Sequence, residues 1–561
     1  MLPESIGRSL YSAVLLLLVT SQDVHSWSLL PQPKSQPVAK DRVHQAETLV
    51  ETLKAGNSYF HPGVRVVSVD GDECGIQLEC HQQDFIDKDD VIFVDRQEFL
   101  TPQKGLDTLL GQALQLYLSQ PWNTIHAFTD KLPHIYLALY LAQYKQGLLH
   151  SNERSTTMDY LETLPSVSAL QHLPLFWDQT MLEELQCSVV KNAVRSRQEE
   201  WKQEFVLIHN VIHTMGLPTS FSSLTLETWY WARSIVSSRA FTDLGNNNYP
   251  CLCPYVDMMN HVTTSQSQES SDVVQCTWDI DGKGYHLRLP QLDSNLGSSS
   301  SLRLEISYGC HSNAHFLMNY GFCIQDDHEQ ALEELATLPV ILPDSNHDEE
   351  TESLWEADGL GNCHQIARNV TLGIGDVGPM ESVLSLCRVA SARARELSRM
   401  KENFVKQGQR TLDADLIPQL GATLCRTPFS VANEIRALQM LQIMTKTALG
   451  RYATTLDEDN DMLLADHQDI HQTVRSPWKR LQSFWTSLFS SAHRDKSFQR
   501  IAQWRNAVTL RREEKKILNH YFLLASIGLE FLQYCTDDDQ FETYKGMLDA
   551  SLHDPEPLVI A

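Results

Sequence analysis

The chain has 561 residues, of which 42% are hydrophobic and 8% aromatic, as in ordinary folded proteins with more than one core. Its 71 acidic residues outnumber 45 basic ones, so the formal net charge is −26. This charge argues against a nucleic-acid partner, whose phosphates would be repelled, and favours a basic protein substrate or no particular partner.

The N-terminus has the pattern of a secretory signal peptide. Arg8 precedes an apolar run, Leu10 to Val19, that is too short for a comfortable membrane span. The acid-free stretch Trp27 to Lys40 that follows also resembles the bipartite plastid leader of algae with complex plastids. A simple signal peptide and an uncleaved anchor are the alternatives. We assign residues 1–26 to a leader and 27–46 to a linker or transit-like segment, and expect no span in the mature chain.

The first predicted elements are a helix and three strands. The apolar spacing from Val43 to Ala55 fits a helix. Short apolar runs split by Asp-rich turns predict strands at Val64–Val67, Gly75–Leu78 and Val91–Val94.

Helical spacing begins at Leu106 and continues to Trp231. One apolar face contains Leu110, Ala113, Leu114 and Tyr117. A single long helix is expected from Met181 to Ile208.

Strand patterns return after Tyr249. Val273–Ile280 and Tyr285–Leu289 flank an Asp-Gly-Lys-Gly turn and predict a hairpin, and Leu302–Ser307 predicts a further strand. The acidic stretch Pro343–Gly361 predicts a domain boundary. Beyond it the spacing predicts helices at Val383–Phe404, Val431–Tyr452 and Trp504–Tyr534.

Two motifs about fifty residues apart indicate chemistry. The first is PYVDMMNH, Pro254 to His261, and the second is EISYGCHSNAHFLMNYGF, Glu305 to Phe322. Each part alone is a common turn or strand end, but their order and separation are specific. Together they resemble the two C-terminal motifs of SET-domain methyltransferases, in particular the subfamily of the Rubisco large-subunit lysine methyltransferase.

The resemblance implies an α+β fold in which a SET β-fold with a knot-like site and a helical insert precedes an all-α domain. Asn433–Asp459 and Ala507–Leu518 resemble helices of that substrate-binding domain. We therefore expect a SET domain at 47–330 with its insert at about 104–232. An acidic linker (331–375), a helical substrate-binding domain (376–545) and a tail (546–561) would follow.

The resemblance also implies S-adenosyl-L-methionine as cofactor and a protein lysine as methyl acceptor. In such a site most of the catalysis is alignment of amine, methyl and sulfur. Tyr308 would be the catalytic residue, with its hydroxyl in the channel that joins the two substrates. Cofactor binding is implied for Gly75, Ile76, Asp257, Asn260, His261 and Tyr308. Substrate binding is implied for Arg239, Phe241, Val256, Tyr320 and Phe322.

Several alternatives remain open at this stage. Family members that methylate an actin histidine carry Asn and Trp where this chain has Phe241 and Val256, so lysine is favoured over histidine. The N-terminal SET motif keeps only Gly75, which motivates a catalytically inert interaction module as a rival. Cys251 and Cys253 form a CxC beside His261, but no further ligands at metal spacing accompany them, so no metal is expected. The predicted function is protein-lysine N-methylation, of a histone or another protein, by a monomer.

Overall fold

The structure is a computed structural model. It describes residues 39–68, 76–80, 90–120, 128–149, 155–243, 249–262, 273–289, 302–324, 335–339, 369–373, 427–464 and 494–553, with short pieces between 383 and 399. The predicted leader, residues 1–26, lies outside these ranges, as does Gly75. No helix of the described part is both long and apolar enough to cross a bilayer.

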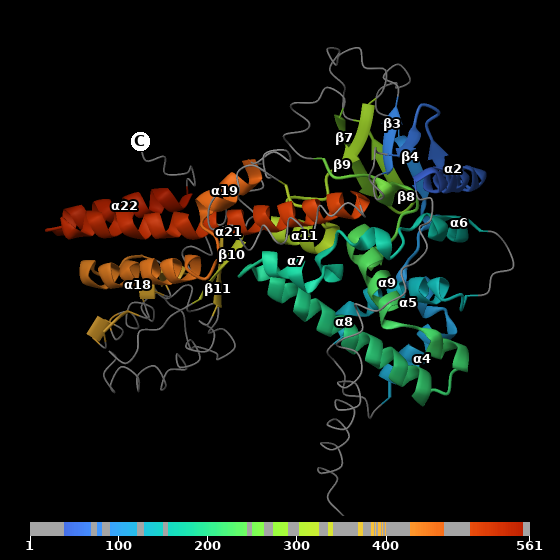
Figure 1. The fold of residues 1–561 in the computed structure, drawn as a ribbon, viewed down its shortest axis with the longest axis horizontal. Coiled ribbons are helices and arrows are strands. Elements are labelled where there is room, and N and C mark those ends of the chain that lie inside the picture. The colour runs from blue at the N-terminus through green and yellow to red at the C-terminus, as the bar shows by residue number, and fades with distance from the viewer. Residues whose placement is uncertain are drawn as a thin grey trace, which may run out of the picture.

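Seven strands of the described ranges form one sheet in the order β1-β4-β8-β7-β9-β3-β2 (Figure 1). Their bounds are β1 Tyr59–Phe60, β2 Arg65–Ser68, β3 Ile76–Cys80, β4 Asp90–Asp95, β7 Val273–Ile280, β8 Gly284–Arg288 and β9 Leu302–Ile306. Neighbours are antiparallel except β7 and β9, which are parallel. The strands predicted from the sequence are confirmed within a few residues.

The predicted hairpin is confirmed and has a local cause. Asp281 Oδ1 accepts hydrogen bonds from the backbone N–H groups of Lys283, at 2.7 Å, and Gly284, at 3.0 Å. This Asp-led turn joins β7 to β8, and the helix α2, Ala39–Ala55, lies near the same sheet (Figure 1).

The insert between β4 and β5 is helical. Its α-helices are α3 Pro102–Leu106, α4 Leu109–Leu118, α5 Leu132–Lys145, α6 Thr156–Thr163, α7 Gln179–Glu184, α8 Val189–Thr214 and α9 Leu226–Arg239. The apolar face predicted on α4 is buried, as expected from its spacing. On α9, Trp229 and Trp231 are among the largest fully buried side chains, and Trp231 Nε1 donates to Pro165 O at 2.7 Å.

The prediction of one long helix from Met181 to Ile208 is wrong. The chain breaks between α7 and α8, and Gln186 there has a φ of 51°. Ser188 caps α8 because its Oγ accepts a hydrogen bond from Val190 N at 3.1 Å. The same hydroxyl donates to Glu514 Oε1 at 2.8 Å, so the break presents a helix N-terminus to a carboxylate from the far end of the chain.

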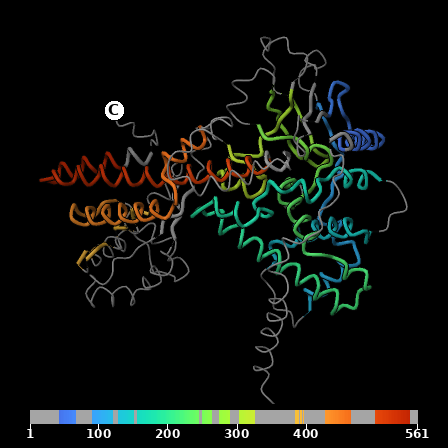
Figure 2. Tube along the Cα trace, in the orientation of Figure 1, coloured from blue at the N-terminus to red at the C-terminus, as the bar shows by residue number. Residues whose placement is uncertain are grey.

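The C-terminal half is mainly helical but not entirely so. Its long helices are α18 Val431–Leu449, α19 Leu456–Leu464, α21 Arg494–Gln533 and α22 Asp538–His553. Figure 2 shows α18, α21 and α22 side by side, and we call these three helices the arm. Helix α21 continues from the arm toward the rest of the chain. The described pieces between 383 and 399 are helical in part, as expected.

The interval predicted as an acidic linker begins and ends with strands. β10 Leu335–Pro339 and β11 Asn369–Gly373 pair antiparallel, and both contact α21. Each run is apolar enough to pack, although acidic residues separate them in the sequence. The predicted linker is therefore corrected to a segment that carries a two-stranded sheet, and both strands lie before the all-α domain predicted at 376–545.

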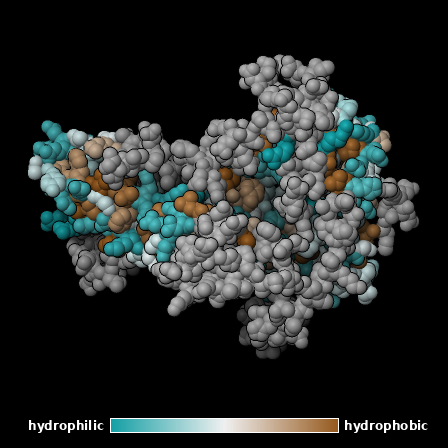
Figure 3. Space-filling view, turned by 45° about the horizontal axis from the view of Figure 1, so that its top comes forward, coloured by the Kyte–Doolittle hydropathy of each residue, from teal (hydrophilic) through white to brown (hydrophobic). Residues whose placement is uncertain are grey.

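Both halves contribute to a shared apolar core. Leu185 and Leu317 pack in one buried cluster with Met462, Trp504 and Val508 of α19 and α21. The arm has a core of its own around α18, α21 and α22. On its surface apolar and polar side chains alternate (Figure 3), and Ile443 and Met547 are each more than half exposed.

A buried ionic cluster lies beside this shared core. Lys515 Nζ donates to Asp459 Oδ2 at 2.5 Å, and Arg511 Nε donates to Asp459 Oδ1 at 3.0 Å. Arg511 Nη1 also donates to Glu184 O, at 2.8 Å, which ties α21 to the end of α7. The ion pairs bring specificity to the contact between halves, because a misplaced helix would leave these charges buried without partners.

Glu514 makes the junction sensitive to pH. Burial raises the pKa of Glu514 to about 7, although hydrogen bonds from Ser188, Tyr452 and Val189 act to lower it. An unfolded chain has a Glu pKa of about 4.3. The folded state therefore binds the extra proton between these values, and this contribution to the unfolding free energy is lost as pH rises toward 7. We expect Glu514→Gln to flatten that dependence, measured by urea unfolding from pH 5 to 8. An equally steep slope in the variant would contradict this.

Candidate active site

The second motif forms a loop and a short helix directly after β9. Gly309, next to Tyr308, has a φ of 104°, which a residue with a side chain rarely adopts. Helix α11, Asn313–Tyr320, begins where Ser312 Oγ accepts from His315 N at 3.2 Å and ends at Gly321 in a left-handed conformation. This geometry returns the chain, so that the rings of Tyr308 and Tyr320 lie 4.7 Å apart.

The first motif is bound to the end of β9. Ile306 N donates to Asn260 O at 3.0 Å, and Val262 N donates to Ile306 O at 3.1 Å. Tyr308 N donates to His261 Nδ1 at 3.0 Å, and the Tyr308 hydroxyl donates to Met259 O at 2.6 Å. Two segments about fifty residues apart thus form one unit that contains Asn260, His261 and Tyr308.

The Tyr308 hydroxyl is a proton donor throughout the working pH range. Burial is the main reason that its pKa lies above the ordinary value of 10, and Tyr320 and Asp257 add to the shift. The positive charge of Arg239 acts in the opposite direction but does not reverse it. Tyr308 can therefore orient an acceptor atom, but it does not serve as a base.

Arg239 and Asp257 form a buried brace under the first motif. Arg239 Nη1 donates to Asp257 O at 3.1 Å and lies 3.4 Å from its Oδ2, which also accepts from the Tyr160 hydroxyl at 2.7 Å. Burial raises the pKa of the Asp257 carboxyl, and Arg239 acts to lower it. For Arg239, burial is the largest effect and acts to lower the pKa, but Asp257, Tyr160 and Tyr308 together outweigh it and the pKa is raised. This contact gives Arg239 a bracing position beside the motif.

An aromatic group surrounds the Tyr308 ring. The ring of His261 lies 5.2 Å from that of Tyr308 and 5.9 Å from that of Phe322. Tyr320 and Phe322 are 6.3 Å apart. We call Tyr308, Tyr320 and Phe322 the aromatic slot; the structure brings together these three residues, predicted from the second motif.

Phe241 and Val256 belong to neighbouring parts of the core. Phe241 begins β5, Phe241–Asp243, which pairs with β6, Tyr249–Cys251, and Val256 is fully buried in the turn before Asp257. The Phe241 ring meets Trp278 and Tyr285 edge to face, at 5.2 and 5.3 Å.

Sequence reasoning missed Trp278 and Tyr285. Trp278 Nε1 donates to Ser307 O at 3.5 Å, beside Tyr308, and the rings of Trp278 and Tyr285 stack at 5.7 Å. The buried Tyr285 hydroxyl has no hydrogen-bond partner among the described residues. Their only sequence signal was the strand pattern on each side of the hairpin, which does not identify a site.

Two predicted cofactor residues lie in β3 or just before it. Ile76 begins β3, where it pairs with Ser68, but its side chain is not described, and Gly75 lies outside the described ranges. The Asn260 side-chain amide is half-buried and makes no hydrogen bond within the described residues. An amide left with its donors and acceptor unused suits a polar ligand.

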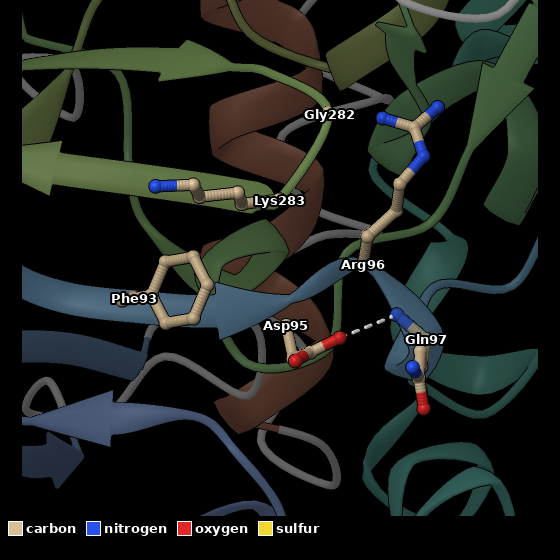
Figure 4. A pocket seen from close by; sticks show the side chains of 6 residues that line it. All are labelled: Phe93, Asp95, Arg96, Gln97, Gly282 and Lys283. Carbon is tan, nitrogen blue, oxygen red and sulfur yellow. Dashed lines mark hydrogen bonds between the residues drawn. The ribbon is translucent and has the colours of Figure 1, made fainter.

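A surface hollow of about 520 Å³ lies elsewhere on the sheet. Its lining residues are Phe93, Asp95, Arg96, Gln97, Gly282 and Lys283. Figure 4 shows Phe93 and Lys283 on one side of it, Arg96 on another, and Asp95 accepting from Gln97 N. The hollow contains none of the residues predicted from the motifs, so we place the candidate site by the motif geometry.

Cys251 and Cys253 lie close together as buried thiols, with their Sγ atoms 3.9 Å apart. Burial is the main cause that raises the pKa of Cys253 well above its ordinary value, which disfavours the thiolate that a metal would need. In the described ranges no three His, Cys, Asp or Glu residues are grouped as metal ligands.

Comparisons with known proteins identify a similar family model, similar sequences and similar structures. The family model described as Rubisco LSMT substrate-binding matches residues 346–518. The chloroplastic Rubisco large-subunit N-methyltransferase of Nicotiana tabacum is 24% identical over 337 residues, 59% of this chain and 61% of that protein. A crystal structure of the SET domain of LSMT bound to MeLysine and AdoHcy matches with a TM-score of 0.56 at 18% identity, covering 91% of this chain and 97% of that one.

The chain is similar to the Rubisco methyltransferase-like subfamily of SET-domain proteins in sequence and in fold. The subfamily resemblance predicted from the two motifs is thereby confirmed, and so are the SET fold and the helical C-terminal region. An actin-histidine N-methyltransferase of Xenopus tropicalis is also similar, at 25% identity over 343 residues, 59% of this chain and 53% of that protein. The chain spans about three fifths or less of the length of these two curated relatives.

Proposed function

We propose that this SET protein is an S-adenosyl-L-methionine-dependent protein-lysine N-methyltransferase that acts on a histone or another protein. The carrying observation is the hydrogen-bonded unit in which β9 joins Asn260 and His261 to Tyr308. It holds the Asn260 carboxamide, which makes no hydrogen bond within the described residues, and the partly buried, protonated phenol of Tyr308 on one continuous support. Such a support fixes two groups relative to one another, which is the main requirement of a displacement at a methyl group.

The cofactor fits the residues of the first motif. When bound, S-adenosyl-L-methionine supplies an electrophilic methyl group. Asn260 would hold it through its unused amide and His261 mainly through its backbone. Asp257 would act indirectly, because its carboxylate braces the segment through Arg239 and Tyr160. Gly75 and Ile76 would complete the cofactor side.

We further propose that the site is knot-like. The pairing of residues 260–262 with Ile306 and the return of the chain through α11 support this, because both motifs converge on one strand end. The proposed domains are a SET domain at 47–330 with its insert at about 104–232, a connecting segment at 331–375, a substrate-binding domain at 376–545 and a tail at 546–561.

Lysine is the proposed acceptor because the slot is aromatic and apolar. Tyr320 and Phe322 offer ring faces that suit an ammonium product, and burial favours a neutral amine by lowering its pKa. Neither Phe241 nor Val256 carries a polar side-chain group that could pair with an imidazole. Arg239 would act on the substrate side indirectly, by holding Asp257 in place.

Histidine methylation is the second candidate, because the Xenopus tropicalis relative is as similar as the tobacco one. Mass spectrometry of lysate proteins incubated with the chain and labelled S-adenosyl-L-methionine separates the two. Label on lysine supports the proposal, and label confined to histidine overturns the proposed acceptor. An inert SET protein would give no label and no heat of cofactor binding.

We expect Asn260→Ala to weaken S-adenosyl-L-methionine binding by about tenfold, the equivalent of one lost hydrogen bond to a ligand. Isothermal titration calorimetry on the full chain measures it. Asn519→Ala is the matched control, since Asn519 is half-buried on α21 and no hydrogen bond of its side chain is found in the described ranges. Equal affinity in Asn260→Ala and the native chain would remove Asn260 from the cofactor site.

A further inference from the structure

The turn between Tyr320 and Phe322 is held by the SET region on two sides. Gly321 N donates to Phe316 O at 3.0 Å and to Leu317 O at 3.1 Å, which ends α11. Gly321 has a φ of 79°, and a Cβ atom there would lie 2.2 Å from His172 Cδ2 in the helical insert. The backbone at this turn therefore packs directly against the insert, and only glycine fits.

A side chain from the C-terminal half holds the third side. Asn506 Nδ2 donates to Gly321 O at 3.0 Å, and Asn506 Oδ1 accepts from Cys323 N at 3.2 Å. One carboxamide thus binds the peptide groups on both sides of Phe322. Because Asn506 belongs to α21, this contact joins residues 183 positions apart in the sequence.

A second amide on α21 docks the helix without touching the turn. Gln503 Nε2 donates to Gln171 O at 2.6 Å. Residues three apart lie on one helix face, so Gln503 and Asn506 point to the same surface. Trp504 and Val508 pack in the shared apolar core, so the helix would stay docked without either amide.

We propose that Asn506 is a positioning residue of the aromatic slot, and that the C-terminal half thereby fixes Phe322 for lysine binding. The inference rests on the proposed function. It extends the proposed function, because the helical half then shapes the aromatic slot in addition to packing against the SET region in the shared core. A protein that shifts α21 on binding would change the alignment of the target lysine.

The experiment compares Asn506→Ala, Gln503→Ala and Asn519→Ala in the full chain. Calorimetry measures binding of N-methyl-lysine to the chain saturated with S-adenosylhomocysteine, and separately of S-adenosyl-L-methionine. Hydrogen exchange read by mass spectrometry follows the amide of Cys323.

In Asn506→Ala we expect Cys323 exchange to rise at least tenfold and N-methyl-lysine affinity to fall about tenfold, because the lost hydrogen bonds fix Phe322. S-adenosyl-L-methionine affinity should stay within about twofold, since the first motif is untouched. Gln503→Ala and Asn519→Ala should keep N-methyl-lysine affinity within about twofold. Asn506→Asp keeps an acceptor for the Cys323 N–H group, so the Cys323 amide should stay protected from exchange. This variant replaces Asn506→Ala in the test if the alanine variant does not fold.

Two results would overturn the inference. One is unchanged N-methyl-lysine affinity in Asn506→Ala. The other is an equal loss of N-methyl-lysine affinity in Gln503→Ala. That result would mean that docking of α21 matters and that the two hydrogen bonds of the Asn506 side chain do not. A native chain that binds neither N-methyl-lysine nor S-adenosyl-L-methionine instead refutes the proposed function. In that case the exchange rate of the Cys323 amide still tests the Asn506 contact. An unchanged rate in Asn506→Ala refutes the role of Asn506 in holding this turn, and a faster rate supports it.

Discussion

Replacing Tyr308 with Phe should reduce methyl transfer by about two orders of magnitude or more, because it removes the hydroxyl that links the second motif to the first. The phenol is partly buried and donates to Met259 O at 2.6 Å. Phenylalanine keeps the ring contacts with His261 and Tyr320, so the unfolding free energy should fall by only about 1 kcal/mol. Transfer of label from S-adenosyl-L-methionine to lysate proteins measures the first quantity, and urea unfolding measures the second.

Tyr230→Phe is the matched control for that variant. The Tyr230 hydroxyl is also mostly buried and donates to a backbone carbonyl, Gln198 O, at 2.8 Å. This hydrogen bond joins α9 to α8 and does not involve either motif. Methyl transfer by Tyr230→Phe should therefore stay near the native rate. Full transfer by Tyr308→Phe would remove Tyr308 from the mechanism.

Replacing Arg239 with Met should destabilise the chain by about 3–5 kcal/mol and abolish cofactor binding with it. The Asp257 side chain is 0% exposed and Arg239 only 14%, so among the described residues the variant leaves a buried carboxylate with Tyr160 as its remaining side-chain partner. Because Asp257 immediately precedes the Met258–Val262 segment, the strain would displace Asn260. Thermal unfolding and cofactor calorimetry measure the two effects.

Arg288→Met is the control, since Arg288 is 39% exposed and pairs with Asp279 and Asp90 on the sheet surface. Surface pairs of this kind contribute at most about 1 kcal/mol. A similar small loss in Arg239→Met would show that Asp257 does not depend on its arginine.

The sequence predicts the parts of this fold that depend on local pattern. The strands around Asp281 and the buried face of α4 follow from alternation and helical spacing, which are properties of neighbouring residues. The break before Ser188 could not be predicted in this way, because the apolar spacing continues across it and Ser188 bonds to Glu514, which is 326 positions away in the sequence. The paired strands β10 and β11 were likewise hidden by the acidic residues between them.

The candidate site shows the same division. The two motifs identify Asn260, His261 and Tyr308, and the structure brings them together through β9. Tyr285 and Asn506 lie in a strand and a helix with no motif, so their proximity to the site is visible only in three dimensions. Arg239 stays a predicted substrate-side residue, and its hydrogen bond to Asp257 is a contact that the motifs did not indicate.

Because the chain is synthesised from its N-terminus, the contact between Asn506 and the turn at Gly321 forms late. Asn506 leaves the ribosome 183 residues after Cys323, a delay of roughly 10 to 40 seconds at common elongation rates. During that interval the nascent SET region lacks α21, and Leu317 of its shared core has no cover from Trp504 or Val508. In the proposed arrangement, synthesis of α21 completes the aromatic slot, and a message that ends before Asn506 would release a product whose slot lacks this contact.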